Sequence, residues 1–337
     1  MSIMIMTVIF GILILLLLIF PHETGHFIAA KACGVEVNEF ALGMGPAIFK
    51  KQHGETLYSL RAIPVGGYCA MEGEDEESDD ENAFENKAAW KKAVVLSAGS
   101  AMNLFLALLI MIILTFYTGV ATTSISEVDV NSPAAAAGLK AGDQITAVNG
   151  KNTDTWNEIT SIVSSAGAGD KIKFDVLRDG KKVSVTSGVK KSSGHAVIGM
   201  RCAVDKSFFS CLTEGFGRTG KMIATLGDAF RMIFTGQVST KELGGPVAII
   251  KVAGDAGKAG AASFFYLAAF ISLNLAIFNL LPFPALDGGR LVFLIIKKIT
   301  GKRVNAELEA KVHFAGIVLL FAFMIYVTWN DITRLIN

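Results

Sequence analysis

Charged residues and cysteines are scarce in this sequence of 337 residues. Only 18% of the residues are charged and 52% are hydrophobic, whereas soluble domains average about 25% and 45–50%. The net charge of +1 and the scattered basic residues exclude a nucleic-acid-binding protein, which would carry a basic stripe. Four cysteines without a CxxC pair indicate free thiols rather than a disulfide scaffold. The apolar excess therefore indicates membrane segments joined to a soluble part.

Four stretches without charged residues are long enough to cross a hydrocarbon core of about 30 Å, which takes roughly 20 helical residues. The first stretch lacks the basic start and the A-x-A site of a signal peptide, so we expect it to be retained. Basic residues crowd positions 297–311, between the last two stretches. This predicts a cytoplasmic loop there and extracytoplasmic chain ends. The stretches are Ile3 to Pro21, Ala93 to Val120, Ala261 to Leu286, and Val312 to Trp329.

The loop between the first two stretches should then be cytoplasmic, and it has two parts. Val35 to Met71 has the pattern of short extended pieces separated by glycine-containing turns. Within it, Glu55 to Met71 is either a purely structural hairpin or an edge to which an extended substrate adds as a strand. The acidic block from Glu72 to Glu81 should stay solvated. A calcium site is the alternative, but the glycine and spacing of an EF-hand loop are absent.

Between about Ala121 and Val204 the composition becomes that of a soluble α+β domain. The run from Ser132 to Gly150, SPAAAAGLKAGDQITAVNG, resembles the helix-turn-strand signature of PDZ domains in bacterial proteases. This resemblance implies that the domain binds extended peptides at a sheet edge; a domain that only blocks access is the alternative. From Lys206 to Thr235 an amphipathic pattern predicts a helix lying against the membrane or the soluble domain.

The chemistry-bearing motif is His22-Glu23-Thr24-Gly25-His26, at the end of the first apolar stretch. A helix places residues i and i+4 on one face, so both imidazoles can bind one metal ion, with Glu23 beside them as a base. Ionisable groups in or near a membrane span are costly and usually mark a functional site. The alternative is a helix that simply ends in water at Pro21.

A catalytic zinc ion commonly has three protein ligands and a fourth position for water. The remaining histidines, His53, His195 and His313, are candidates for the third ligand, although each is more easily a surface residue. Asp287 is the better candidate because two prolines and two glycines interrupt the apolar stretch around it, in NLLPFPALDGG. Irregular backbone at membrane depth is tolerated only beside protein or a watery cavity, so this break should line the site.

Together, the HExxH motif, the PDZ-like segment and the Asn-x-x-Pro-x-Pro-x-x-Asp-Gly motif resemble the site-2 protease family of intramembrane metalloproteases. Within that family the chain is similar, over essentially its whole length, to bacterial regulators of envelope stress with a single PDZ domain. Leu243 to Ile249 also looks like a family segment. One departure is Gly99-Ser100 before Asn103, where many relatives have Gly-Pro; it leaves the local helix geometry open.

The resemblance implies residue roles and a cofactor. The cofactor would be Zn²⁺, and substrates would be transmembrane proteins already cut by another protease. The implied roles are metal ligation by His22, His26 and Asp287, base catalysis by Glu23, and support of the substrate or of the reacting carbonyl by Asn279, with Asn274 a weaker candidate.

The expected fold is a polytopic α-helical membrane protein with four transmembrane helices, a cytoplasmic strand-rich loop and an inserted extracytoplasmic PDZ domain. The expected segments are the first transmembrane helix with HExxH (1–34), the strand-rich and acidic loop (35–92), the second transmembrane helix (93–120), the PDZ domain (121–205), an amphipathic segment (206–260), the third transmembrane segment (261–298), a basic loop (299–311) and the fourth transmembrane helix (312–337).

The expected function is regulated intramembrane proteolysis in the bacterial inner membrane, with the active site toward the cytoplasm. Its substrates would be single-span proteins such as anti-sigma factors or remnant signal peptides. A catalytically silent membrane adaptor that binds exposed protein termini is the alternative, but it would have no need of these polar groups in a membrane. A zinc transporter is disfavoured because the sequence offers only one metal cluster.

Overall fold

The computed structural model describes residues 2–74, 78–167, 169–192, 195–237, 244–301 and 306–336. The chain divides into two compact units, which we call the membrane unit (Met1–Met111 with Gly217–Asn337) and the inserted unit (Ile112–Phe216). Parts of four predicted internal segments lie outside the described residues: 75–77 of the acidic block, 168 and 193–194 of the PDZ segment, 238–243 of the amphipathic segment, which include Leu243 of the predicted Leu243 to Ile249 family segment, and 302–305 of the basic loop.

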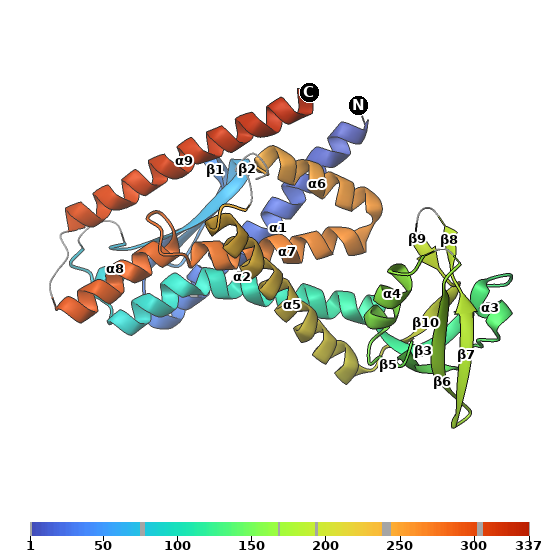
Figure 1. The fold of residues 1–337 in the computed structure, drawn as a ribbon. Helices are drawn as coiled ribbons and strands as arrows, with labels where there is room; N and C mark the ends of the chain where they lie inside the picture. Colours follow the sequence, from blue (N-terminus) through green and yellow to red (C-terminus); the bar gives the residue numbers. More distant parts are fainter. Residues whose placement is uncertain are drawn as a thin grey trace. The chain divides into compact units, whose positions relative to one another are not determined.

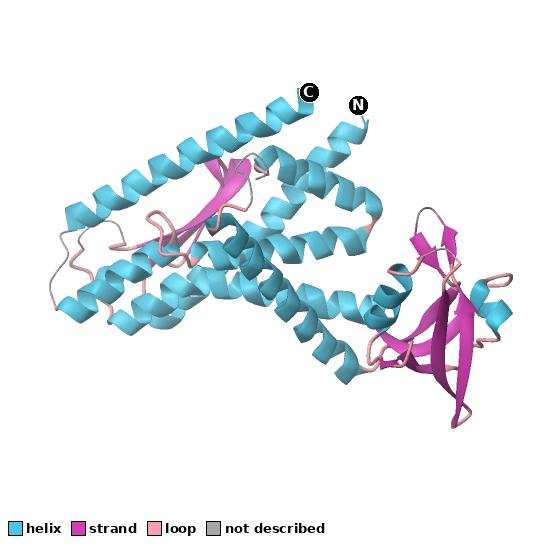
Figure 2. Ribbon diagram, viewed as in Figure 1, coloured by secondary structure: helices cyan, strands magenta, loops and turns pink. Residues whose placement is uncertain are grey.

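Helices make up most of the membrane unit, and the strands among its described residues form one hairpin (Figures 1 and 2). Among the described residues, four helical segments are long and apolar enough to cross a membrane: Ile5–Cys33, Ala89–Thr118, Ala261–Asn279 and Leu308–Arg334. The elements are α1 (Ser2–Cys33), β1 (Val37–His53), β2 (Thr56–Met71), the 3₁₀ turn η1 (Phe84–Asn86), α2 (Ala89–Thr118), α5 (Phe208–Phe234), α6 (Pro246–Ala259), α7 (Ala261–Asn279), α8 (Asp287–Thr300) and α9 (Ala306–Ile336).

Helix α1 continues through Pro21 and ends at Cys33. Proline removes one backbone hydrogen bond from a helix interior, but apolar helices tolerate it where neighbours compensate. The interpretation of a helix that ends in water at Pro21 is therefore wrong. His22 and His26 lie on a continuing helix, one turn apart. Helix α6 packs against the N-terminal half of α1, with Ile250 in contact with Gly11.

The third apolar stretch is broken, as its prolines and glycines suggested. Helix α7 ends at Asn279, before the predicted limit of the stretch at Leu286, because Pro282 and Pro284 cannot continue the helical hydrogen bonding. The chain then crosses a short irregular loop, and α8 begins at Asp287. The acidic side chain of the motif therefore stands at the first turn of a helix. Helix α2, by contrast, is continuous from Ala89 to Thr118. The Gly99-Ser100 pair, found where many relatives have Gly-Pro, therefore does not interrupt the helix.

The segment from Val37 to Met71 is strand-rich, but it is not a series of short pieces separated by turns. It is one hairpin of two long strands with repeated register shifts, closed at His53↔Thr56. Gly43 and Gly66, which have positive φ, lie inside the strands, because glycine accommodates β-bulges that bend a strand without ending it. The register pairs residues 39–42 both with 67–70 and with 57–60, so the hairpin folds back on itself.

The inserted unit is an α+β domain built on one main sheet with the strand order β10-β3-β4-β6-β7. The predicted Asn149-Gly150 and Asp179-Gly180 turns have positive φ at both residues, which favours tight hairpin connections. Its elements are β3 (Val120–Val128), α3 (Pro133–Ala137), β4 (Gln144–Val148), β5 (Lys151–Asn152), α4 (Trp156–Ser164), β6 (Lys171–Arg178), β7 (Lys181–Gly188), β8 (Lys190–Ser192), β9 (His195–Val197) and β10 (Met200–Asp205).

A buried ion pair ties β6 to the loop before β4 in this unit. The Asp143 side chain has no exposed surface, and its two oxygens accept hydrogen bonds from Arg178 Nε (2.6 Å) and Nη2 (2.7 Å) and from the Lys140 backbone N–H (2.9 Å). The Arg178 guanidinium, with the backbone donor, lowers the pKa of Asp143 below its ordinary value. The folded state therefore favours the ionised carboxylate.

This ion pair predicts a pH-dependent stability of the inserted unit. A carboxyl whose pKa is lower in the folded state stabilises above its unfolded pKa of about 3.9, and this contribution is lost as the pH falls toward the folded value. We expect Asp143→Asn to speed hydrogen exchange of β4 and β6 about tenfold at pH 7, because charge-assisted hydrogen bonds are lost. Hydrogen exchange is measured on the full-length wild-type protein and on the full-length Asp143→Asn variant. Equal effects of the substitution at pH 7 and well below pH 3.9 would contradict this linkage.

Candidate metal centre

Two helices far apart in sequence bring three potential metal ligands together. His22 and His26 come from α1, and Asp287 comes from the first turn of α8. The two imidazole Nε2 atoms lie 3.3 Å apart. Asp287 Oδ2 lies 3.6 Å from Nε2 of His22 and 3.4 Å from Nε2 of His26. Among the described residues, these three side chains form the one group of His, Cys, Asp or Glu that could hold a metal ion.

The spacing of these three atoms fits a tetrahedral zinc site. Ligand bonds of 2.0–2.1 Å at tetrahedral angles place the ligand atoms about 3.3–3.4 Å apart, close to the 3.3, 3.4 and 3.6 Å found here. Asp287 Oδ2 is also buried without a hydrogen-bond partner, a costly state for a carboxylate oxygen unless a cation faces it. Two imidazoles and one carboxylate are a donor set that zinc accepts while keeping one position open.

The other imidazole nitrogens are held by contacts behind the centre. His26 Nδ1 lies 2.9 Å from the Val95 carbonyl oxygen, so it donates there and leaves Nε2 as the metal-facing acceptor. His22 Nδ1 lies 3.4 Å from the amide of Asn103. The Asn103 side chain has no exposed surface, and its Oδ1 is without a partner. Exchanging its amide oxygen and nitrogen lets Nδ1–H of His22 donate to Oδ1, and both histidines then present Nε2.

Gly99 of α2 is in direct contact with both imidazoles. A Cβ at this position would lie 2.2 Å from Nε2 of His26 and 2.6 Å from Cε1 of His22. The approach is therefore possible only without a side chain, and α2 can pack this closely on α1 because residue 99 is glycine.

Gly99→Ala is expected to displace His26 and to lower the zinc affinity at least about tenfold, the scale of losses seen when ligand orientation is disturbed. Chelator competition on the purified protein measures this affinity. Gly220→Ala is the matched control, because a Cβ at that helical position meets nothing within 4 Å. Unchanged zinc affinity in Gly99→Ala would show that this contact does not determine the imidazole geometry.

The other predicted site residues are Asn279, Asn274 and Glu23, and they differ in their contacts with the three potential ligands. Asn279 Nδ2 is 3.2 Å from Nε2 of His22, so its amide belongs to the cluster. Asn274 instead donates to the Phe270 carbonyl of its own helix, at 2.8 Å. Glu23 lies against β2, where a Cβ on Gly67 would come within 3.1 Å of Glu23 Cγ.

The other three histidines lie away from the three ligand atoms or outside the described side chains. His53 is exposed at the end of β1. His195 begins β9 of the inserted unit, and its side chain is outside the described part of the structure. His313 of α9 accepts a hydrogen bond from the Ala285 backbone N–H, in the loop that precedes Asp287. The Cys69 thiol of β2 is buried, and its burial, together with the nearby Glu23 and Glu74 carboxylates, raises its pKa to about 12, so it stays protonated.

Sequence reasoning did not assign Asn103 to the site, although a signal was present. Asn103 is a polar side chain within an apolar span, and such residues usually face the interior of a helix bundle. Its backbone carbonyl accepts a hydrogen bond from Ser272 Oγ at 2.8 Å, which ties α2 to α7 behind the histidines.

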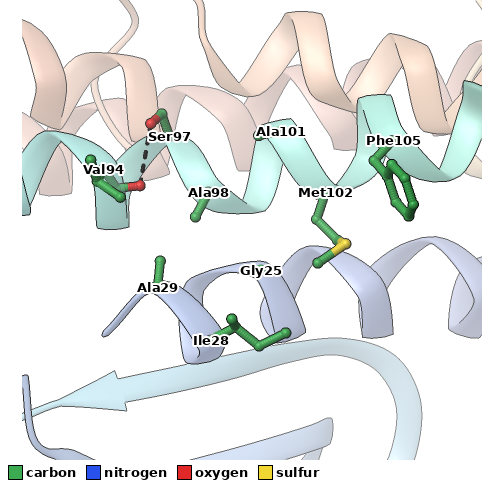
Figure 3. Close-up of a pocket in the computed structure, with 9 residues that line it drawn as sticks. All are labelled: Gly25, Ile28, Ala29, Val94, Ser97, Ala98, Ala101, Met102 and Phe105. Carbon is green, nitrogen blue, oxygen red and sulfur yellow. Dashed lines mark hydrogen bonds between the residues drawn. The ribbon is translucent and has the colours of Figure 1, made fainter. Parts of the chain in front are cut away.

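An apolar groove of about 420 Å³ lies between α2 and α1, the helix that carries His22 and His26 (Figure 3). Its lining includes Gly25 and Ile28 of α1 and Val94, Ala101 and Phe105 of α2. Ser97, also in the lining, donates its hydroxyl to the Ala93 carbonyl. The residues that line the groove therefore include no titratable group.

Comparisons with known proteins agree on one family. The sequence model of Peptidase family M50 matches residues 10–323. A protein from Clostridium acetobutylicum is 39% identical over 332 residues, which cover 97% of this chain and 96% of that protein. The regulator of sigma-W protease RasP of Bacillus subtilis is 32% identical over 417 aligned positions, covering 98% of this chain and 99% of that protein.

Among solved structures, the PDZ domain of an SdrC-like protein from Listeria monocytogenes matches with 26% identity and a TM-score of 0.22. The match covers 25% of this chain and 87% of that domain. The family match, by contrast, spans nearly the whole sequence, including His22, His26 and Asp287. The chain belongs to peptidase family M50.

Proposed function

We propose that this protein is a zinc-dependent intramembrane endopeptidase that cuts peptide bonds in or near transmembrane segments of single-span proteins. The observation that carries the proposal is the position of the metal centre. His22 and His26 lie on a helix long and apolar enough to span a membrane, and Asp287 faces them from α8. This position supports a hydrolysis within the membrane because the three potential ligands belong to the helical membrane unit.

In the proposed mechanism, His22, His26 and Asp287 would hold the zinc ion. When bound, zinc would supply Lewis-acid chemistry, polarising a carbonyl oxygen and lowering the pKa of water. Glu23 takes the proton of the attacking water and passes it to the leaving amine. The Asn279 amide, within 3.2 Å of His22 Nε2, supports the carbonyl oxygen that gains charge. Asn274 is assigned a structural role because its amide is engaged within α7.

A helical substrate segment must unwind before its carbonyls are accessible, since they are already hydrogen-bonded. We propose that β2 holds the unwound segment as an added strand. The close approach of Gly67 to Glu23 supports this role because it puts β2 next to the proposed base. Cross-linking of a cleavable substrate only to surfaces away from residues 55–71 would contradict the clamp.

The substrate class and the membrane orientation complete the proposal. A relative named regulator of sigma-W protease supports membrane-anchored regulators, such as anti-sigma factors, as substrates, along with remnant signal peptides, each first shortened by another protease. The proposed orientation has the metal centre toward the cytoplasm and the inserted unit and both chain ends outside, in the bacterial inner membrane. The basic residues near 297–311 support this orientation.

The proposal is tested by comparing the membrane proteomes of cells that carry wild-type protein or Glu23→Gln. The expected result is that short membrane-anchored fragments accumulate only in the variant. A silent adaptor predicts instead that both proteins capture the same partners and leave the same fragments. Identical fragment profiles in the two strains would therefore reject proteolysis in favour of the adaptor.

A further inference from the structure

The loop between α7 and α8 contains a backbone conformation that its residue does not favour. Ala285 has a φ of 80°, in the left-handed region where the Cβ of an L-residue meets its own backbone. Ala285 stands two positions before Asp287, so its conformation sets how the chain enters α8. A strained residue persists only where the surrounding structure holds it in place.

Helix α9 supplies contacts that hold this loop. His313 Nδ1 accepts a hydrogen bond from the Ala285 backbone N–H at 3.0 Å. One turn later Gly316 is buried, and a Cβ there would lie 2.5 Å from the Pro284 carbonyl oxygen. The His313 ring also packs on Phe293 of α8, with ring centroids 5.5 Å apart. The last helix thus contacts both the loop and the helix that together carry Asp287.

We propose that His313 is a positioning residue for the metal centre. By holding Ala285 in its left-handed conformation, it fixes the first turn of α8 so that Asp287 Oδ2 faces the two imidazoles. His313 itself is not among the three side chains that cluster as potential ligands. This inference rests on the proposed function of Asp287 as a zinc ligand.

The chemistry of the contact suggests discriminating substitutions. Asparagine can place its Oδ1 near the position of Nδ1 and still accept the Ala285 N–H, whereas leucine has no acceptor. Glycine adopts positive φ at little cost, so Ala285→Gly removes much of the need for the restraint. Gly316→Ala disturbs the same loop from the Pro284 side. Phe314→Leu is the matched control on α9, since the Phe314 side chain is 68% exposed.

The experiment measures zinc affinity by chelator competition, the visible absorption of the cobalt-substituted protein, and thermal unfolding of the full chain. We expect His313→Leu to weaken zinc binding about tenfold or more and to change the cobalt spectrum, with little change in the unfolding temperature. His313→Asn should keep both metal readouts near wild type. Adding Ala285→Gly to His313→Leu should restore part of the affinity, and Phe314→Leu should change nothing.

The variants distinguish a failure of the positioning role of His313 from a failure of the proposed ligand role of Asp287. Asp287→Asn with unchanged zinc affinity would reject the proposed ligand set. If Asp287→Asn weakens zinc binding but His313→Leu leaves affinity and cobalt spectrum unchanged, only the positioning role is wrong. A loss in His313→Leu that neither His313→Asn nor Ala285→Gly repairs would also overturn it. If His313→Leu does not fold, Gly316→Ala must weaken zinc binding for the inference to stand, and normal affinity there would reject it.

Discussion

Substituting Glu23 by glutamine is expected to lower the rate of peptide cleavage by about 10²- to 10⁴-fold, the usual contribution of a positioned acid–base group. Glutamine has nearly the shape of glutamate and can keep the packing against Gly67, but it cannot take a proton from water. Zinc content should stay at the wild-type level because Glu23 is not one of the three residues that cluster as potential ligands. Cleavage of a transmembrane substrate in detergent, with elemental analysis of the same preparation, measures both quantities.

The matched control for this substitution is Glu127→Gln. Glu127 lies in the inserted unit with its side chain 61% exposed, and the same change of charge there should leave cleavage intact. Full activity of Glu23→Gln would remove Glu23 from the mechanism. A loss of activity accompanied by a loss of zinc would show that the residue supports the metal centre rather than acting as a base.

Replacing His22 by alanine is expected to empty the metal centre. Two of three ligands would remain, and the buried Asp287 Oδ2, which has no hydrogen-bond partner, would face one imidazole instead of two. Catalytic zinc sites normally keep three protein ligands, so we expect zinc to fall to near background after dialysis against a chelator. Cleavage should fall with it.

His53→Ala is the control for metal content because His53 is exposed at the end of β1. It removes the same functional group from the same chain without touching the cluster. Zinc retained stoichiometrically in His22→Ala would contradict the ligand assignment. Zinc lost from both variants would indicate nonspecific binding through surface histidines.

Local patterns in the sequence predicted the parts of the fold that depend on neighbouring residues. Apolar runs predicted the four long helices, and the spacing of His22 and His26 predicted their shared helical face. Pro282 and Pro284 predicted the break before Asp287, because proline acts on its own turn of the chain. The turn predicted at His53-Gly54 is confirmed, because it closes the hairpin. Gly43 and Gly66 were misread as turns, since a bulge and a turn have the same local signal and differ only in the pairing beyond it.

The contacts around the metal centre were harder to predict because they join distant helices. Gly99 lies close to His26, and Asn103 close to His22, but the packing of α2 on α1 that creates these contacts cannot be read from local periodicity. His313 was considered only as a possible ligand or a surface residue. Its side chain contacts a backbone N–H of the loop before α8. No residue spacing in the sequence predicts such a contact between a side chain and a distant backbone group.

The wide sequence separation of the three potential ligands has a consequence for the order in which the metal centre is made during synthesis. His22 and His26 are made near the start of synthesis, whereas Asp287 follows only after both units have been largely translated, and His313 comes later still. Chains generally fold from the N-terminus during synthesis, so a partly made chain inserts its first helices with an incomplete set of ligands. On the proposed ligand assignment, hydrolysis would therefore require a chain completed at least through Asp287, because a shorter chain lacks one of the three ligands.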